Sequence, residues 1–594
     1  LLLILRKLRL NRMLRNAESH FATVPNLDMP RSAMSRSCGH QTTFNVGQCI
    51  PLYVDTDILP GDSVRMTTSK VLRLQTMLTP TFGNMFYDIY WFFVPHRLVW
   101  THWKQFMREN TESAWIPQTE YELPSISSPL DANNDPTYFA PCTLADYLGW
   151  PTDAKWDNDA ECRPHVLGIR AYALIMNEFF RSTVVTDPLN IPTGDSNQTG
   201  SNGSNYINDV ANAGMPFVAA KTFDYFTSAS PTPQRGPSVG FSFTPTLTVD
   251  GLAPVGSKNI GHDFSDFPLD LYSPARPASS TPEMYHAIYG GANAHVDGDH
   301  TGTDWWPDSD TSEITGNDSH PYMRPVNLWS DVSQVISLDG GVSFDINELR
   351  LAFQLQKFYE RLAIGGDRYI ETIKSMFSVT SPDARLQRPE YLGGNRVPII
   401  VDEVTNTAQT NSDFLGDVGA KSVTSDIHQD FDHSFTEHGT LMCIGVCRYT
   451  HLYTGLERMW TRRKWTDFYW PLFQNLGSQP IWDCEIYPDD TTMATKSVFA
   501  YNEAWSEYRY KPDRVSGEMR PSHPQTLASW NLADNYQSCP TFSDGWIRED
   551  KTNVDRTLAV TSSVSNQIFA DFFFDSVYTR VMPVYSLPGL IDHH

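Results

Sequence analysis

INELRLAFQLQKFYERLAIGGDRYIETIKSMFSVTSPDARLQRPEYLGG, residues 346–394, is the stretch that most constrains the fold. Its first half has a helical pattern, because apolar side chains recur at steps of three and four residues. Asp345 precedes the pattern as a candidate N-cap, with Glu348 three residues on, as in a capping box. The apolar face consists of Leu349, Ala352, Phe353, Gln356, Tyr359 and Leu362, widened by Leu351, Leu355 and Phe358.

A second, shorter helix is expected after this one. Gly365-Gly366 ends the first helix, since glycine favours the position just past a helix. The second helix carries Tyr369, Ile370, Ile373 and Met376, and Ser381-Pro382-Asp383 then turns the chain. Because the pair has a broad apolar face, we expect it to lie on a large apolar surface.

The rest of the chain predicts a loop-rich protein dominated by strands. The 594 residues are 40% hydrophobic and only 19% charged, with 40 Pro and 35 Gly. Residues 63–75 alternate between apolar and polar side chains, which predicts a half-buried strand. Residues 84–94 (NMFYDIYWFFV) and 439–451 (GTLMCIGVCRYTH) are almost wholly apolar, which predicts strands buried on both faces. Residues 397–433 are polar and are expected to form loops.

The net charge argues against a protein that wraps nucleic acid over its whole surface. The chain has 45 basic and 69 acidic residues, a formal charge of −24. Neutralising phosphates requires an excess of basic side chains. Any contact with nucleic acid must therefore be local, or be delegated to a separate basic partner.

The cysteines indicate neither a disulfide framework nor a metal site. Eight cysteines are scattered over the chain, as expected for buried thiols in a reducing compartment. Cys443 and Cys447 lie near His433, His438 and His451, which suggests zinc. If residues 439–451 form a strand, however, the two cysteines stand about 13 Å apart and cannot share one ion. We therefore expect no metal, no cofactor and, in the absence of a GxSxG elbow, no catalytic residues.

Several short segments of the sequence resemble those of a known protein family. The helical stretch quoted above is one, and the others are spread from the beginning of the chain to its end. They are the pattern PRS…RS…H…TTFN within 30–45, LPGDSVRM with NMFYDIYWFFVPHRLVW, IRAYALIMNEFFRS, KTFDYFTSASPTPQRGPSV, TGLERMWTRRKWTDFYWP and the C-terminal 553–594. Together they closely resemble the major capsid proteins of the Microviridae, small tailless single-stranded DNA phages, in the gokushovirus branch.

This resemblance implies the fold and the function. The fold would be the viral eight-stranded antiparallel jelly roll, a β-sandwich with long loops, inserted helices and a large surface insertion. The function would be self-assembly, through pentamers and trimeric contacts, into a T=1 icosahedral capsid around circular single-stranded DNA. The implied partners are a small basic internal DNA-binding protein, minor spike or pilot proteins, the genome and a host receptor. The implied location is the virion, assembled in the cytoplasm of a bacterial host.

The expected organisation follows the same scheme. Residues 1–47 form an extended N-terminal arm, 48–241 the first part of the capsid domain, and 326–594 its remainder and a C-terminal arm. Within the arm, the basic segment 1–12 has two interpretations: a DNA-directed extension, or, as we favour, translation upstream of a true start at Met13.

Residues 242–325 form a variable acidic insertion in this scheme, which the resemblance identifies as a surface protrusion that meets the host. Acidic residues outnumber basic ones there, and Trp305 and Trp306 stand beside Asp304 and Asp308. The two tryptophans are candidates for contact with a receptor. The same residues support an alternative, a secreted β-sandwich that binds carbohydrate or hydrolyses glycosides, which requires an export signal that the N-terminus does not show.

Basic residues beside aromatic ones are the candidates for facing nucleic acid. Arg462, Arg463 and Lys464 are flanked by Trp460, Trp465, Phe468, Tyr469 and Trp470, and bases can stack on such rings. Arg31 and Arg36 lie on the N-terminal arm. The alternative, which we favour for 462–464, is a solvated or intersubunit charged turn beside aromatic residues of the core.

Overall fold

The computed structural model describes residues 30–111, 119–239, 283–288, 322–327, 346–407 and 415–585. The chain divides into two compact units, Leu1–Pro237 with Lys357–His594 and Ser238–Gln356. In the second unit the described elements are an antiparallel hairpin of β8 (Glu283–Ile288) and β9 (Tyr322–Asn327) and the beginning of α7 (Ile346–Gly365). Residues 1–12, Trp305 and Trp306 lie outside the described residues.

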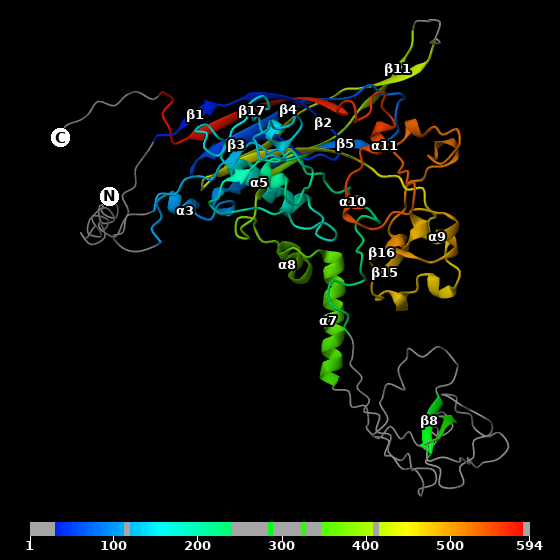
Figure 1. Ribbon diagram of the computed structural model, residues 1–594. Coiled ribbons are helices and arrows are strands. Elements are labelled where there is room, and N and C mark those ends of the chain that lie inside the picture. The colour runs from blue at the N-terminus through cyan, green and yellow to red at the C-terminus, as the bar shows by residue number, and fades with distance from the viewer. Residues whose placement is uncertain are drawn as a thin grey trace, which may run out of the picture. The chain divides into compact units, whose positions relative to one another are not determined.

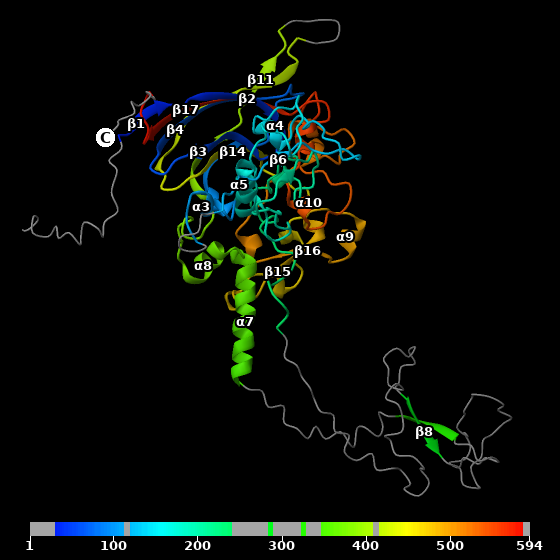
Figure 2. The ribbon, with the colours of Figure 1, turned by 60° about the vertical axis from the view of Figure 1, so that its left-hand side comes forward.

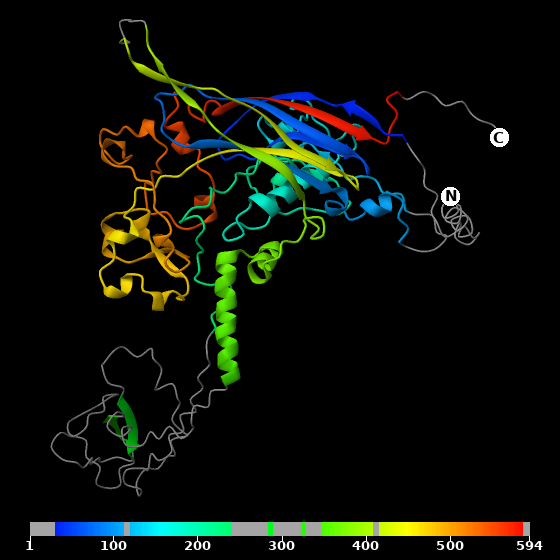
Figure 3. The same ribbon diagram turned by 180° about the vertical axis from the view of Figure 1, so that it is seen from behind.

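Two antiparallel sheets build the first unit (Figures 1 and 3). The first has the order β1-β17-β4-β13, and β2 also pairs with β17. Its strands are β1 (Ser32–Ser35), β2 (Cys38–Phe44), β4 (Ser63–Leu74), β13 (Thr424–Ser434) and β17 (Ile568–Arg580). The second has the order β10-β5-β14-β3, with β3 (Ile50–Ile58), β5 (Met85–Pro95), β10 (Glu390–Pro398) and β14 (Gly439–Tyr449). The prediction of a protein made mainly of antiparallel strands is confirmed.

The main core fills the space between the two sheets. Strands β4 and β17 alternate buried and exposed residues along most of their length, so one face of each points inward. Val64 and Met66 from β4 and Phe572 and Phe574 from β17 meet Trp91 from β5 in this core. The first sheet therefore has one buried face, whereas the second is covered on both.

A second core explains why β5 and β14 lack polar alternation. Leu441, Cys443 and Cys447 of β14 face the first core, whereas Met442 and Ile444 face the second. The covering layer is built around α5 (Leu167–Ile175), which continues into a π-helical turn, η2 (Met176–Phe180). Figure 2 shows α5 against the second sheet, where it contacts β3 and β14.

A third core lies in the C-terminal part of the first unit. It joins Tyr225, Phe226 and Tyr453 to the hairpin of β15 (Gln479–Trp482) and β16 (Val498–Asn502). Two further small sheets pair β6 (Ile126–Ser127) with β7 (Gln198–Thr199) and β11 (Val401–Thr405) with β12 (Val418–Ser422). Short helices in the connections include α3 (Trp103–Phe106), α4 (Leu144–Tyr147), α9 (Asp490–Ala494), α10 (Asp544–Ile547) and α11 (Thr552–Asp555). Across the described ranges, none of the helices has the length and apolarity needed to cross a membrane.

Two expectations about strands were wrong. Residues 397–433 contain β11, β12 and most of β13, because these strands present polar, largely exposed faces that look like loop sequence. Residues 38–44 belong to the first sheet as β2, and its Phe44 is buried, whereas the sequence suggested an arm outside the core.

The helix pair forms as predicted, as α7 and α8 (Tyr369–Phe377), but the described residues cover its apolar side chains only in part. Tyr369 is 71% exposed and Phe377 is 75% exposed, and Phe358 and Ile364 of α7 are also exposed. None of the α8 residues is buried. Ile370, Ile373 and Met376 are half-buried, so the exposed apolar surface of α8 is that of Tyr369 and Phe377.

Candidate functional site

The basic cluster Arg462-Arg463-Lys464 lies in the irregular segment between β14 and β15. Three single turns shape this segment: η6 (Arg458–Trp460), η7 (Trp465–Asp467) and η8 (Pro471–Phe473). The backbone N–H groups of Arg463 and Lys464 donate to Asp467 Oδ2 at 2.8 and 2.9 Å, which fixes the turn. These backbone bonds lower the pKa of the Asp467 carboxyl group.

Only part of this cluster is available to a ligand. Arg462 is committed within the chain, since its guanidinium pairs with Glu507 at 3.3 Å and lies 4.1 Å from the ring centre of Tyr508. Arg463 and Lys464 are exposed. Within the described part of the chain, Arg463 and Lys464 are therefore exposed cations without an ion pair, on a turn that Asp467 holds in place.

The aromatic residues beside the cluster do not belong to the core, contrary to the interpretation favoured from the sequence. Trp465 is 66% exposed and Leu472 is 92% exposed. Trp460, Phe468, Tyr469 and Trp470 are exposed as well. We call residues 459–476 the aromatic loop. Its exposed apolar area is of the kind that marks an interaction surface.

The two arginines of the N-terminal region differ in their surroundings. Arg31 is exposed, next to the turn between β3 and β4. Arg36 donates to the buried Asp55 at 2.6 Å and its guanidinium lies 4.8 Å from the ring centre of Tyr578. Although burial would lower the pKa of Arg36, the Asp55 carboxylate raises it. Arg36 thus anchors β1 to the sandwich.

The structure does not bring these candidates into one site. Figures 1 and 2 place β1 at one end of the first unit, well separated from β15 and β16, next to which the aromatic loop is inserted in the chain. Two separate basic regions are therefore present, and neither is large.

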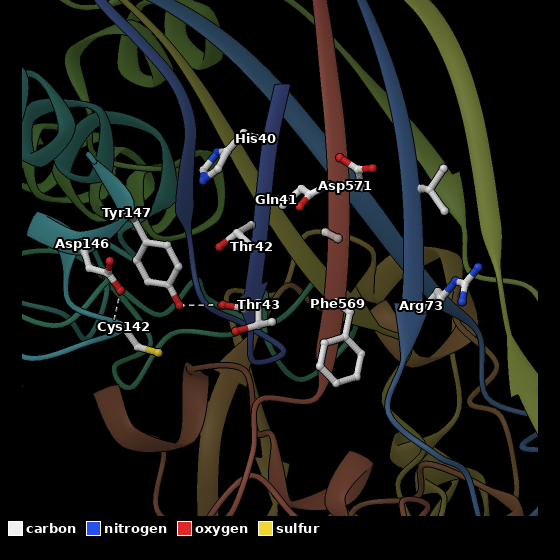
Figure 4. A pocket seen from close by; sticks show the side chains of 12 residues that line it. His40, Gln41, Thr42, Thr43, Arg73, Cys142, Asp146, Tyr147, Phe569 and Asp571 are labelled. Carbon is white, nitrogen blue, oxygen red and sulfur yellow. Dashed lines mark hydrogen bonds between the residues drawn. The ribbon is translucent and has the colours of Figure 1, made fainter. Parts of the chain in front are cut away.

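A shallow pocket of about 580 Å³ lies on the outer face of the first sheet, between β2 and α4 (Figure 4). His40 and Cys142 both line it, but the His40 ring bonds to the Leu52 carbonyl at 2.8 Å. The Tyr147 hydroxyl donates to the Thr43 carbonyl at 2.9 Å. Since the polar groups are engaged in holding α4 and β2 in place, the pocket does not assemble a nucleophile with a base.

The residues that suggested zinc have structural roles. Cys443 and Cys447 lie on a strand, as predicted, and burial raises the pKa of both thiols well above the usual range. The His451 ring lies between Asp534, at 2.9 Å from Nδ1, and Glu549, at 2.8 Å from Nε2. His451 is therefore a buried bridge between two carboxylates.

A cavity beside α8 gathers basic and aromatic residues that the sequence did not single out. Arg181, Arg368, Arg388 and Arg448 line it, and they come from four different segments of the chain. In the sequence, the segment SPDARLQRPEYLGG brings a basic and an aromatic residue of this cavity close together, Arg388 and Tyr391. The other residues approach one another only through the fold.

Comparison with known proteins decides the family. Residues 22–590 match the family model described as "Capsid protein (F protein)". The chain belongs to this capsid-protein family. It is 34% identical to "Capsid protein VP1" of Spiroplasma virus 4, over 97% of this chain and 98% of the relative. It is also 34% identical to "Capsid protein VP1" of Chlamydia phage 1, over 96% and 98%, and 31% identical to "Capsid protein VP1" of Bdellovibrio phage phiMH2K, over 97% and 98%.

This capsid protein is thus a structural protein of a virion and not an enzyme, and the resemblance to the Microviridae is confirmed. The alternative of a secreted glycoside hydrolase is wrong. The exposed helix pair and the aromatic loop then have a ready interpretation, since a capsid protein must present surfaces to neighbouring copies.

Proposed function

We propose that the sandwich is the eight-stranded jelly roll of viral capsids. The support is the pairing of its eight long strands, taken in chain order. The outermost two, β2 and β17, pair with each other, as do β3 and β14, β4 and β13, and β5 and β10. Such nested pairs are those of one long hairpin rolled up into two sheets.

This capsid protein then assembles with copies of itself into a T=1 icosahedral shell around a circular single-stranded DNA genome. The observation that carries the self-assembly is the group of exposed apolar side chains on α7 and α8, among them Tyr369 and Phe377. A soluble monomer seldom exposes large apolar patches. A neighbouring copy is the occupant that a closed symmetrical shell supplies.

The negative charge of the chain supports a second, basic protein that neutralises the genome. At −24 the chain repels both its own copies and DNA unless local patches compensate. A small basic internal DNA-binding protein would neutralise the genome, leaving the capsid protein with local contacts at Arg31, Arg463 and Lys464. Minor spike or pilot proteins would complete the particle, which assembles in the cytoplasm of a bacterial host.

The acidic insertion is the part that meets the host cell. Residues 242–325 belong to the second compact unit, Ser238–Gln356, so their sequence can vary without changing the sandwich. Trp305 and Trp306 remain the candidate receptor contacts.

Electron microscopy of the purified, full-length capsid protein tests this function. The expected images show closed particles with icosahedral symmetry of T=1 geometry. Open sheets, filaments or particles of another triangulation number would overturn the T=1 assignment. The variant Phe377→Asp, which places a charge on the face that a copy would cover, should give no closed particles, and Leu130→Asp, at another exposed apolar position, is the matched control.

A further inference from the structure

A cavity among the described residues of the first unit lies between the outer face of the second sheet, the turn η2 and helix α8. Its volume is about 980 Å³. Strand β5 supplies Tyr90 and Phe92, and the segment between α8 and β10 supplies Asp383 and Arg388. We call it the basic groove.

The charge of the basic groove is opposite to that of the whole chain. Six basic side chains line it, against three acidic ones. The basic residues are Arg181, Lys221, Arg368, Arg388, Arg396 and Arg448, and the acidic ones are Glu178, Glu371 and Asp383. Arg396 and Arg448 pair with Asp88, and Lys221 pairs with Asp534, so carboxylates outside the lining already balance these three cations. In a chain of net charge −24, the remaining arginines of the lining still favour an anionic ligand.

Two of the arginines keep unused capacity to donate hydrogen bonds. Arg181 donates to the Thr186 carbonyl at 2.8 Å and forms no ion pair with the described part of the chain, and its buried Nε has no hydrogen bond. Burial and the nearby Arg368 lower the pKa of Arg181. A bound anion would stabilise the charged form of this side chain. Arg388 forms two long ion pairs, from Nε to Glu178 at 3.7 Å and to Asp383 at 3.5 Å, and its buried Nε makes no hydrogen bond within the described part of the chain.

A continuous set of aromatic rings lies beside these cations. Phe92 contacts Phe179 with ring centres 4.7 Å apart and Tyr391 with ring centres 5.7 Å apart. The Arg388 guanidinium lies 4.3 Å from the ring centre of Phe179. At the mouth, Phe223 is 89% exposed, without a covering side chain. Phe92 is buried, so the rings that a ligand can reach are Tyr391, 47% exposed, and Phe223. The groove therefore combines phosphate-binding groups with two accessible aromatic rings.

We propose that the basic groove binds a short unpaired stretch of nucleic acid, with phosphates on Arg181 and Arg388 and bases stacked on Tyr391 and Phe223. Guanidinium groups bind phosphate oxygens in a fixed fork, and unpaired bases stack on phenyl rings without regard to sequence. An acidic segment of another copy, as an alternative ligand, would pair with the arginines but would not stack on the aromatic rings. Duplex DNA offers phosphates but hides the faces of its bases.

Fluorescence anisotropy on the full-length protein tests this proposal. The probe is a labelled oligothymidylate of about ten nucleotides, a length in the range of single-strand binding sites. Phe223→Ala and Arg181→Gln should each raise the Kd about tenfold or more. Arg181→Gln should also reduce the slope of log K against log salt by about 0.7, the contribution of one phosphate contact on a single strand. Phe573→Ala and Arg65→Gln, exposed residues on β17 and β4, are the matched controls and should leave the Kd unchanged.

Two competitors identify the ligand class. Unlabelled oligothymidylate should displace the probe, whereas a duplex of equal length and a polyglutamate peptide of equal charge should be much weaker. Displacement by polyglutamate as strong as by the oligonucleotide, or equal affinity of the control and groove variants, would overturn the proposal. Phe223 is exposed, so its variant tests the groove even where Arg181→Gln impairs folding.

The proposal rests on the proposed function only for the natural source of the nucleic acid. Electron microscopy of the same samples separates the two ideas. Closed shells from a protein that binds no oligonucleotide would overturn the basic groove and leave the capsid function standing. Tight binding by a protein that never assembles would support the groove and count against the shell.

Discussion

Trp91 donates its indole N–H to Asp430 Oδ2 at 2.7 Å, inside the sandwich and across its two sheets. Asp430 is the extra residue of a bulge in β13, where the register with β4 shifts between Gln429 and Phe431. The bulge turns a carboxylate into the core, where it also accepts a hydrogen bond from Thr68. One irregularity in a strand thus supplies the polar link between β13 and β5.

Replacing Asp430 should therefore destabilise the sandwich more than replacing an exposed aspartate does. Asp430→Ala leaves the buried Trp91 N–H and Thr68 hydroxyl without a partner, at a cost of about 1–3 kcal/mol each. We expect a clear decrease in Tm by differential scanning calorimetry. Asp432→Ala, two residues away and exposed, is the control, and equal Tm values for the two variants would contradict this role.

The buried bridge at His451 predicts a dependence of stability on pH. Burial alone would lower the pKa of His451, but Asp534 and Glu549 raise it to about 9. Lys221 stands 3.6 Å from Asp534 and adds a second cation. Since the folded protein holds the proton more tightly than the unfolded chain, the bridge stabilises fully below pH ~6.5 and this contribution is lost as the pH rises through about 9.

The measurement is Tm against pH from 6 to 10 for the wild type and His451→Gln. The wild type should be more stable at pH 6, and the difference should shrink towards pH 10. His523→Gln, at an exposed histidine, should follow the wild type throughout. A constant difference between wild type and His451→Gln at all pH values would show that the imidazolium contributes nothing.

The exposed side of α8 should matter for assembly and not for folding. Tyr369→Asp adds a charge to a side chain that is already mostly in solvent, so the Tm of the unassembled chain should change little. Buried against a second copy, the same charge would cost several kcal/mol and block the contact. Light scattering under assembly conditions measures this, and normal scattering growth would exclude this face from the interface.

Deleting the insertion should separate attachment from assembly. Replacing residues 242–325 by a short Gly-Ser linker removes most of the second compact unit and leaves all strands of the two sheets in place. We expect particles of normal symmetry that no longer adsorb to host cells in a sedimentation assay. A deletion variant that fails to fold would show that the insertion belongs to the capsid domain.

The sequence predicted elements well where both faces of a strand are buried. In NMFYDIYWFFV eight of the eleven positions pack in one of two cores, so the apolar run itself revealed β5. It failed for β13, whose outward residues are polar and whose bulge at Asp430 interrupts the alternation. Strand pairing was the only signal there, and pairing is not visible in local sequence.

The functional surfaces were predictable only in part, for a related reason. Arg462, Arg463 and Lys464 are neighbours in the chain, so the sequence showed them as a cluster, but it could not show that Glu507 neutralises the first. Arg181 and Arg388 are separated in the chain by the whole insertion and both helices, and they meet at the basic groove only after folding. The exposure of the aromatic loop was not predicted either, because tryptophans are buried on average, whereas Trp465 is exposed.

Sedimentation velocity of the purified chain over a range of salt concentrations and protein concentrations tests the central claim most directly. If this sandwich exists to pack against copies of itself, the protein sediments as closed particles or their subassemblies, with little material at 67.3 kDa under assembly conditions. A single species of 67.3 kDa under every condition would contradict the account.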